Sequence, residues 1–355
     1  MRRLSVSQAR ELSRAAFAAV DLPSEQAEIC TNAVLFASLR GLDSHGIISI
    51  LPGLVGRIAR GQIDRSAPIE TIRDDTVTAL LKGNGTIGPV MAEHAMRLAM
   101  TKAKEHGVGI VVGYNCDHFG AASYYSSLAV EQGLIGMVMC NAAANVAPFG
   151  GTKGVHGTNP ISYGIPGQQE GPLVLDIATS TAAHGQIGKA RRRGQAMPVG
   201  WAIDREGRPT TDPAAAAALL PFGGHKGYGI GLLVDALTGA LAGWQVTLGV
   251  TQGEGEMKVR GQSIFMQAID PERFAAPGVF RERVDQIVRD VRSIPPAEGF
   301  KEVLLPGDLE QRQQEERTRL GIPLYDEDWD ALSQGLVRAG VPTDIVNQYT
   351  PAAGN

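Results

Sequence analysis

Cysteine is scarce in this chain. Three cysteines, Cys30, Cys116 and Cys140, occur in 355 residues, and their odd number and wide spacing suit neither a disulfide framework nor a metal site. The seven histidines are scattered, without the close pairs that metal ligands need. We therefore expect reduced thiols, no metal site and a location in the cytoplasm.

Excess positive charge and long apolar runs are also lacking. Lysine and arginine total 33 against 37 acidic residues, a net charge of −4, so no positive field would attract nucleic acid. No run approaches the ~18 apolar residues that span a membrane, and the opening sequence lacks the apolar stretch of a signal peptide. We expect neither a nucleic-acid partner nor a membrane segment.

Glycine, by contrast, is abundant. It fills 44 of 355 positions, roughly twice its usual ~7% share, and forms no repeat. Glycine serves tight turns and places where the backbone closely approaches a ligand. The length suits two domains or more, and the composition predicts a soluble enzyme rather than a disordered or fibrous chain.

The hydrophobic pattern divides the chain into three regions. Apolar positions first recur at helical spacing, then short β-rich runs alternate with alanine-rich helical stretches, and the chain ends in a helical pattern. We expect a helical segment over 1–72, an α/β core over 73–290 and a second helical segment over 291–355. The alanine-rich stretch 212–221 predicts a further short helix, opened by Pro213.

Residues 83–88, Gly-Asn-Gly-Thr-Ile-Gly, match the G-x-G-x-x-G turn of a Rossmann dinucleotide-binding unit. The motif follows a strand-like run and precedes a helix-like one, as that unit requires. The next strand-like run, however, ends in Tyr114 and Asn115 rather than in the acid that would bind ribose. A plain strand-to-helix turn is therefore the favoured interpretation.

Two histidines lie in motifs that suit acid–base chemistry. His45 ends the stretch RGLDSH (40–45), where Asp43 and Ser44 could orient its ring and Arg40 could attract an anionic substrate. His118 lies between a strand-like and a helix-like run, where ligands and anions tend to bind. Histidine exchanges protons near neutral pH. The alternatives are that His45 is a structural histidine with its hydrogen bonds made at a helix end, and that His118 is a solvated loop histidine.

Further segments have the character of ligand sites. Lys226 lies within the glycine cluster 223–229 before a long apolar run, so backbone N–H groups and an ammonium could approach a phosphate there. The stretches 157–160 and 175–180 resemble ligand-facing strand ends, although the second could simply cap a helix. The triplet 191–193, three arginines, could read a 2′-phosphate, but a charge run is usually a solvated face.

Taken together and in order, these segments resemble the malate/L-lactate dehydrogenase family, whose members lack a Rossmann domain. The matching stretches are RGLDSHG (40–46), the glycine turn 83–88, CDHFGAA (116–122), GTNP (157–160), LDIATS (175–180), GWAIDREGRPTTDP (200–213), PFGGHKGYG (221–229) and LLPGDLE (304–310). The resemblance implies an α/β fold with a family-specific, non-Rossmann NAD(P)-binding sheet between helical N- and C-terminal segments. It further implies a homodimer in which the N-terminal segment contributes to the substrate site and packs on the C-terminal one.

Carried over by position, the resemblance assigns roles to these motifs. His45 and His118 become the acid–base candidates, with Ser44 beside the first, while Arg40, Ser49 and Thr158 fall at substrate positions. The positions expected to contact NAD(P)H are Phe119, Gly120, Asn141, Ala142, Asn159, Asp176, Ile177, Ala178, Thr179, Ser180, His225, Lys226, Pro306, Gly307 and Asp308.

Two departures from the family pattern concern the substrate and the cofactor. Members often carry an arginine four residues after the first histidine, where this chain has Ser49, and the loop that usually reads Pro-Gly-Glu is Pro-Gly-Asp at 306–308. Either another cation such as Arg40, Arg57 or Lys153 reaches the substrate carboxylate, or the substrate is not a simple dicarboxylate; we favour the second.

The expected activity is NAD(P)H-dependent hydride transfer to or from a small 2-oxo or 2-hydroxy acid. An imine reductase acting on a cyclic 2-imino acid or a secondary-metabolite imine is the alternative, and the serine at position 49 favours it. A protein that binds dinucleotide without turnover is a third interpretation, which the intact His45, His118 and Lys226 oppose.

Overall fold

A seven-stranded mixed sheet forms the centre of the molecule, in the order β2-β3-β4-β11-β5-β6-β7. The computed structural model describes residues 2–250 and 261–351. The strands of the sheet are β2 (Glu70–Asp74), β3 (Thr78–Thr86), β4 (Val108–Cys116), β5 (Ile135–Cys140), β6 (Ile161–Ile165), β7 (Leu173–Ile177) and β11 (Gln262–Ile269). Within it β3 and β4 pair in parallel and the other neighbours pair antiparallel. A Rossmann sheet is mostly parallel, so the expected non-Rossmann α/β fold is confirmed.

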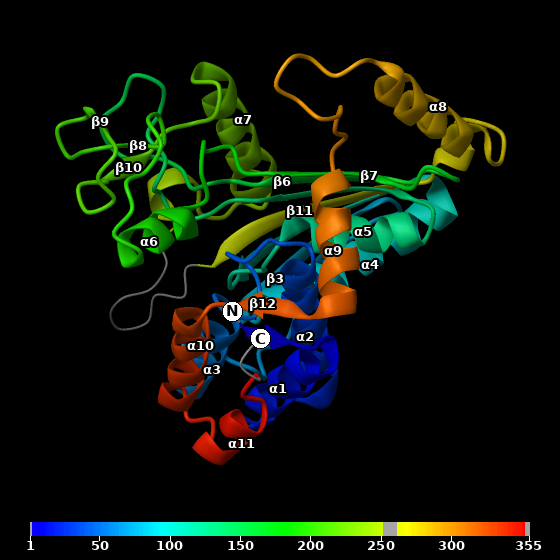
Figure 1. The fold of residues 1–355 in the computed structure, drawn as a ribbon. Helices are drawn as coiled ribbons and strands as arrows, with labels where there is room; N and C mark the ends of the chain where they lie inside the picture. The colour runs from blue at the N-terminus through cyan, green and yellow to red at the C-terminus, as the bar shows by residue number, and fades with distance from the viewer. Residues whose placement is uncertain (1, 251–260, 352–355) are drawn as a thin grey trace.

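Helices cover both faces of this sheet (Figure 1). Those on one face are α4 (Gly88–His106) and α5 (Ala122–Glu131), and those on the other are α7 (His225–Asp235) and its π-helical continuation Ala236–Ala240. Central strand β11 is apolar on both sides: Ile264 and Met266 face the α4 side, and Phe265 packs toward α7. This double burial explains why its sequence reads as a nearly continuous apolar run.

The glycine turn 83–88 is a packing feature. Strand β3 continues to Thr86 and α4 begins at Gly88. A Cβ atom on Gly88 would overlap the carbonyl oxygens of Asp117 and His118. The glycine therefore lets α4 start directly against the segment that carries His118, as the interpretation of a plain strand-to-helix turn predicts.

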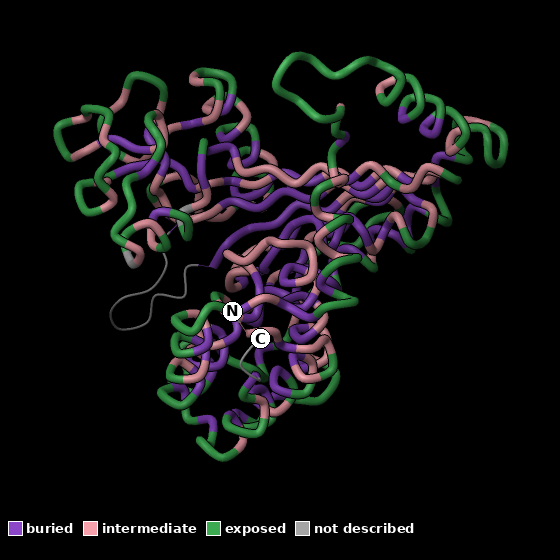
Figure 2. Tube along the Cα trace, viewed as in Figure 1, coloured by how far each residue is buried: buried purple, intermediate pink, exposed green. Residues whose placement is uncertain are grey.

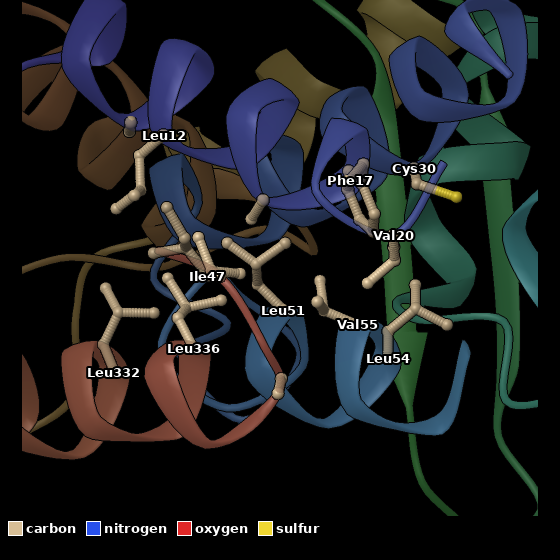
Figure 3. Close-up of a cluster of buried hydrophobic side chains, with 14 of the residues drawn as sticks. Leu12, Phe17, Val20, Cys30, Ile47, Leu51, Leu54, Val55, Leu332 and Leu336 are labelled. Atoms are coloured by element: carbon tan, nitrogen blue, oxygen red, sulfur yellow. The ribbon is translucent and has the colours of Figure 1, made fainter. Parts of the chain in front are cut away.

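Helices from the two ends of the chain share a second core. They are α1 (Val6–Ala18), α2 (Ser24–Leu39), α3 (Leu51–Ala59), α10 (Asp326–Arg338) and α11 (Thr343–Gln348). Leu12 and Phe17 of α1, Leu51 of α3, and Leu332 and Leu336 of α10 are all buried there (Figure 3). The short strands β1 (Arg2–Leu4) and β12 (Ile322–Leu324) pair antiparallel beside them, so the first and last described elements, β1 and α11, lie in the same lobe (Figure 1).

A smaller lobe contains α6 (His184–Arg192) and the three-stranded sheet of β8 (Ala202–Ile203), β9 (Pro209–Thr210) and β10 (Ala218–Leu219). The helix expected over 212–221 is wrong, because β10 occupies part of that stretch and the rest is turn. The amides of Ala217 and Leu219 donate to the carbonyls of Ile203 and Asn145 at 2.8 Å. These tertiary strand pairings outweigh the helical propensity of alanine.

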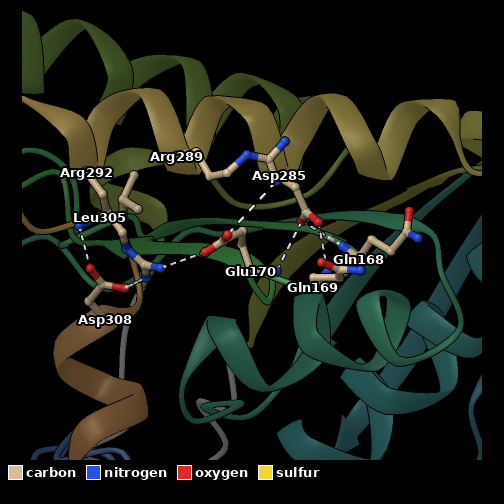
Figure 4. A network of polar contacts seen from close by, with 8 residues as sticks. All are labelled: Gln168, Gln169, Glu170, Asp285, Arg289, Arg292, Leu305 and Asp308. Carbon is tan, nitrogen blue, oxygen red and sulfur yellow. Dashed lines mark hydrogen bonds and ion pairs between the residues drawn. The ribbon is translucent and has the colours of Figure 1, made fainter.

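Helix α8 (Val279–Ser293) lies at the edge of the molecule, and most of its surface is exposed (Figure 2). Asp285 anchors it by accepting hydrogen bonds from the amides of Gln168, Gln169 and Glu170 (Figure 4). The chain then continues into α9 (Asp308–Leu320), which runs back to the N-terminal helices. In the part of the chain described, no helix is both long and apolar enough to cross a membrane.

Candidate active site

The two candidate acid–base histidines lie side by side. Their ring centroids are 5.5 Å apart and their planes are inclined by 20°. His45 belongs to the segment between α2 and α3, whereas His118 directly follows β4. The structure therefore brings together two motifs that are far apart in the sequence.

His118 is held in one tautomer. Its Nδ1 accepts a hydrogen bond from the amide of Gly120 at 3.2 Å, so in the neutral ring the proton is on Nε2. Burial, together with the nearby charges of His45 and Arg57, lowers the pKa of His118 to about 3. At neutral pH the ring is uncharged, and Nε2–H is available as a hydrogen-bond donor.

His45 has a different kind of partner. The Ser44 hydroxyl lies 2.8 Å from His45 Nδ1, and a hydroxyl can either donate or accept a hydrogen bond. Burial lowers the pKa of His45 as well. Because Ser44 can adapt to both protonation states, His45 can gain and lose a proton without losing this hydrogen bond.

An ion pair supports the loop that carries His118. Arg57 of α3 donates from Nη2 and Nε to Asp117 Oδ2 at 2.7 and 3.2 Å. Arg57 was one of the cations considered for the substrate carboxylate, and its guanidinium instead ties α3 to the residue before His118. Sequence reasoning did not identify this pair, although Asp117 adjoins His118.

The amide side chains expected near the cofactor connect three parts of the core. Asn141 accepts from the amide of Ser263 at 2.8 Å and donates to the carbonyl of Gln245 at 3.1 Å. Asn159 accepts from the amide of Ala142 at 3.0 Å and donates to the carbonyl of Gly231 in α7 at 2.9 Å. These bonds fix the strand ends at 141–142 and 158–159 against α7.

The stretch 175–180 lies beside the glycine cluster. The amide and hydroxyl of Thr179 both donate to the carbonyl of Thr158, at 2.8 and 3.0 Å, and the carbonyl of Thr179 accepts from the amide of Phe222 at 3.1 Å. Ser180 bonds to the carbonyl of Ala182 at 2.7 Å. Thr158, the 175–180 stretch and the 221–229 turn are therefore one contiguous structure.

Lys226 projects from the first turn of α7. The turn before it contains Gly223 and Gly224 at φ 56° and 64°, a conformation that glycine adopts without strain. Lys226 is exposed and pairs with no acid among the described residues. His225 next to it lies edge-on to Phe149, with ring centroids 5.9 Å apart.

Asp176 is the penultimate residue of β7 and caps helix α5. Its Oδ2 accepts from the amide of Ser123 in the first turn of α5 at 2.9 Å, whereas α6 begins after Ala183 without a side-chain cap. Burial raises the pKa of Asp176, although the Ser123 bond opposes the shift. Ile177 and Ala178 continue the chain from Asp176 toward Thr179.

The motif that contains His118 holds two further residues expected near the cofactor. Phe119 is buried, and Gly120 has a φ of 90°.

The Pro-Gly-Asp loop packs against the start of β7. The carbonyl of Pro306 accepts from the amide of Val174 at 3.2 Å, and Gly307 precedes α9 at φ 97°. Asp308 accepts from the amide of Leu305 at 2.8 Å and from Arg292 at 3.2 Å (Figure 4). Both carboxylate oxygens of Asp308 thus accept hydrogen bonds from the protein itself. The side chain, one methylene shorter than the usual glutamate, therefore stabilises the conformation of the loop.

Comparisons with known proteins identify the family of this chain. A family model described as malate/L-lactate dehydrogenase matches residues 4–333. The chain belongs to this family. Its resemblance to that family, inferred from motifs alone, is confirmed, and the chain is a dehydrogenase of this family.

Its relatives match over nearly their whole length. The L-sulfolactate dehydrogenase of Methanothermobacter thermautotrophicus is 38% identical over 324 residues, which are 91% of this chain and 93% of that protein. The ureidoglycolate dehydrogenase (NAD(+)) of Escherichia coli O157:H7 is 33% identical over 307 residues, 86% and 88% of the two chains. The solved structure of sulfolactate dehydrogenase from Methanocaldococcus jannaschii superposes with a TM-score of 0.87 at 34% identity, covering 96% of this chain and 98% of that one.

A cavity of about 970 Å³ lies next to Ser44, the serine whose hydroxyl bonds to His45, and neither His45 nor His118 is among its lining residues. Ser44 and Ser49 both line it, and the Ser49 hydroxyl donates to the carbonyl of Asp43 at 2.9 Å. Arg40 lies elsewhere: it donates to Gln314 at 3.0 Å, and its guanidinium carbon lies 4.6 Å from the centroid of the Phe36 ring.

The cations that do line the cavity come from α6 and its end: Lys189, Arg191 and Arg193. Sequence reasoning considered only the arginines 191–193, as a solvated charge run or a site for a 2′-phosphate, and did not single out Lys189. Arg40, Arg57 and Lys153, the cations it considered for the substrate, are not among the lining residues.

Proposed function

We propose that this dehydrogenase transfers a hydride between a nicotinamide cofactor and the C2 carbon of a small 2-oxo or 2-hydroxy acid. The observation that carries the proposal is the stacked pair His45 and His118, which Ser44 links to the cavity because it both lines that cavity and bonds to His45. Reduction of a carbonyl needs one proton for its oxygen. A neutral imidazole is not itself a proton source, so one ring of the pair must first take up a proton, which it then passes to the carbonyl oxygen while the other ring orients that oxygen.

The described residues fit a nicotinamide dinucleotide. Lys226 and the amides at the start of α7 offer positive charge without an acidic partner in the described chain, which suits a phosphate. The hydroxyls of Ser123 and Ser263 are buried without a hydrogen-bond partner, next to Asp176 and Asn141 respectively. We propose that these groups hold NAD or NADP. The other residues expected to contribute are His225, the stretches 119–120, 141–142, 159 and 176–180, and the loop 306–308.

When bound, the nicotinamide supplies or accepts the hydride. We assign the proton to His45, because Ser44 stabilises its ring in both protonation states. His118 cannot accept a proton on Nδ1 without losing the bond from the Gly120 amide. Its role is to donate a hydrogen bond from Nε2–H to the substrate oxygen and so to orient it, while Ser49, which lines the cavity, and Thr158 are the expected substrate contacts.

Imine reduction is the second candidate, favoured by the serine at position 49. An imine nitrogen also needs a proton donor, so the same histidines would serve it. The dehydrogenase names of the curated relatives support it less than hydroxy-acid chemistry.

A substrate panel separates these functions. Purified protein is supplied with NADH or NADPH and 2-oxo acids or cyclic 2-imino acids, or with NAD⁺ or NADP⁺ and 2-hydroxy acids, and cofactor absorbance is followed. We expect turnover of 2-oxo acids. Turnover confined to imino acids would establish the alternative, and binding of dinucleotide without turnover of any compound would refute both. Running each arm with both cofactors gives the preference between NAD and NADP.

We also propose that the enzyme is a cytoplasmic homodimer. Ile287 of α8 and Ile294 after it are 52% and 60% exposed, and apolar side chains gathered on one surface support a protein interface. Cys30, Cys116 and Cys140 are buried thiols without disulfides, which suits a reducing compartment. Sedimentation of the wild type and of Ile287→Asp tests the first point: the variant should shift toward monomer.

A further inference from the structure

The cavity beside His45 has a strongly basic wall. Gly185, Lys189 and Arg193 all line it, and their spacing of four residues places them on one face of α6 and its continuation. A Cβ atom on Gly185 would lie 3.3 Å from Ser44 Cβ, so this face starts at the serine that bonds to His45. With a helical rise of 1.5 Å per residue, Lys189 and Arg193 follow roughly 6 and 12 Å further along the axis.

These cations have no acidic partner in the described residues. Lys189, Arg191 and Arg193 form no ion pair there. The guanidinium carbon of Arg193 lies 5.0 Å from the centroid of the Tyr325 ring, which orients the group but leaves its donors without a carboxylate. Like charges four residues apart on a helix repel one another, so a bound anion between Lys189 and Arg193 would relieve an unfavourable arrangement.

The other walls leave room for such an anion and do not neutralise the cations. Three alanines at 216–218 also line the cavity and contribute only small side chains to it. Glu327 and Asp328 of α10 also line the cavity, but Asp328 accepts from the amide of Tyr325 at 3.3 Å and caps its own helix. An anion near Lys189 would therefore be recognised by the α6 face.

We propose that Lys189 and Arg193 form a subsite for a second oxyanion on the substrate, separated from the reacting carbon by a longer side chain than that of oxaloacetate. This proposal rests on the proposed function and names its substrate class: 2-oxo or 2-hydroxy acids with a terminal carboxylate, sulfonate or phosphate. It also explains why this chain has Ser49 where family members often carry an arginine: the distal charge of the substrate would be bound by α6 instead of by a side chain at position 49. The reaction at C2 is unchanged.

The test compares two acids of equal chain length, 2-oxoadipate and 2-oxohexanoate, which differ in the terminal carboxylate. The readout is the ratio of their kcat/KM values in the wild type, in Lys189→Gln, in Arg193→Gln and in the conservative Lys189→Arg. We expect the wild type to favour the diacid, each glutamine variant to lower the ratio about 10- to 100-fold, as loss of a charged hydrogen bond would, and Lys189→Arg to retain most of it. Lys153→Gln, an exposed lysine outside the cavity lining, should leave the ratio unchanged.

The failures can be told apart. A wild type that reduces neither acid nor any other 2-oxo acid refutes the proposed function. A wild type that reduces 2-oxo acids without preferring the diacid, or a ratio that survives both glutamine variants, overturns the subsite alone. Thermal unfolding accompanies each variant. If a glutamine variant is unfolded, the ionic-strength dependence of the wild-type ratio decides, because the preference must weaken as salt screens the charge.

Discussion

His45 and His118 stack with their ring centroids 5.5 Å apart, so protonation of one ring disfavours protonation of the other. The positive charge of Arg57, held by Asp117, acts in the same direction on His118. The pair therefore holds at most one proton beyond its neutral state over the working range of pH.

The first prediction concerns the roles of the two rings. His45→Gln and His118→Gln should each lower kcat by the roughly 10²–10⁴-fold associated with general acid–base catalysis, with the larger loss at His45. The measurement is steady-state kinetics against pH on the best 2-oxo acid. The acidic limb of the kcat profile should change in His45→Gln. Near-wild-type kcat in both folded variants would show that neither ring takes part.

The second prediction concerns stability at low pH. Burial holds the pKa of His118 near 3 in the folded chain, against about 6.5 in the unfolded one. Between these values the unfolded state binds more protons, so the free energy of unfolding should fall as the pH falls from about 6.5 to 3. Urea unfolding at several pH values should show a shallower slope in His118→Gln. The control His106→Gln, at an exposed site, should keep the wild-type slope.

The third prediction concerns the cofactor. Lys226→Ala should raise the dinucleotide Kd, because a positive charge beside a phosphate is lost. Its free energy of unfolding should stay within ~0.5 kcal/mol of the wild type, as for most exposed sites. Fluorescence titration with NADH and NADPH measures the Kd, with Lys301→Ala, another exposed lysine, as the control. An unchanged Kd would remove Lys226 from the site.

The fourth prediction concerns the packing under His118. In Gly88→Ala the new methyl group would overlap the carbonyls of Asp117 and His118, and such overpacking costs about 1–3 kcal/mol of stability. The loop of His118 should move with it, lowering kcat. Gly229→Ala is a control in α7 with no neighbour within 4 Å of the new atom, and it should be neutral or stabilising. Equal stabilities of the two variants would contradict the close contact.

The fifth prediction concerns Ser49, which lines the cavity. Ser49→Arg should improve turnover of oxaloacetate relative to the best native substrate, because a short diacid needs its cation close to the reacting carbon. Competition assays with the two substrates measure the change. A wild type that already reduces oxaloacetate with kcat/KM in the usual range of about 10⁴–10⁸ M⁻¹s⁻¹ would contradict the argument.

Helices could be located from the sequence where the local hydrophobic pattern determines the structure. Helices α4, α5, α9 and α10 begin and end within a few residues of the alternating or amphipathic runs that predict them. Pro52 is compatible with α3 because it lies in that helix's first turn, where a missing N–H costs little. The expected helix at 212–221 failed because β10 gains its hydrogen bonds from residues far along the chain, and no local pattern reports such partners.

The same limit applies to the site. His45 and His118 could be identified because each lies at the end of an element, but their stacking, and the ion pair between Arg57 and Asp117, depend on how α3 meets β4. The basic wall of the cavity was least accessible to sequence reasoning. A run of arginines looks the same whether it faces solvent or Ser44, and only the close approach of Gly185 to that serine distinguishes the two.

The pairing of β1 with β12 sets the order in which this protein can be completed during synthesis. Leu4 finds its strand partner at Ile322, and the apolar faces of α1 and α3 are covered by α10 only after that. At ribosomal rates of about 5–20 residues per second, these faces remain uncovered for tens of seconds after they emerge. The first helices to be made are thus among the last to be buried, which makes the nascent chain a client for chaperones that shield apolar surface.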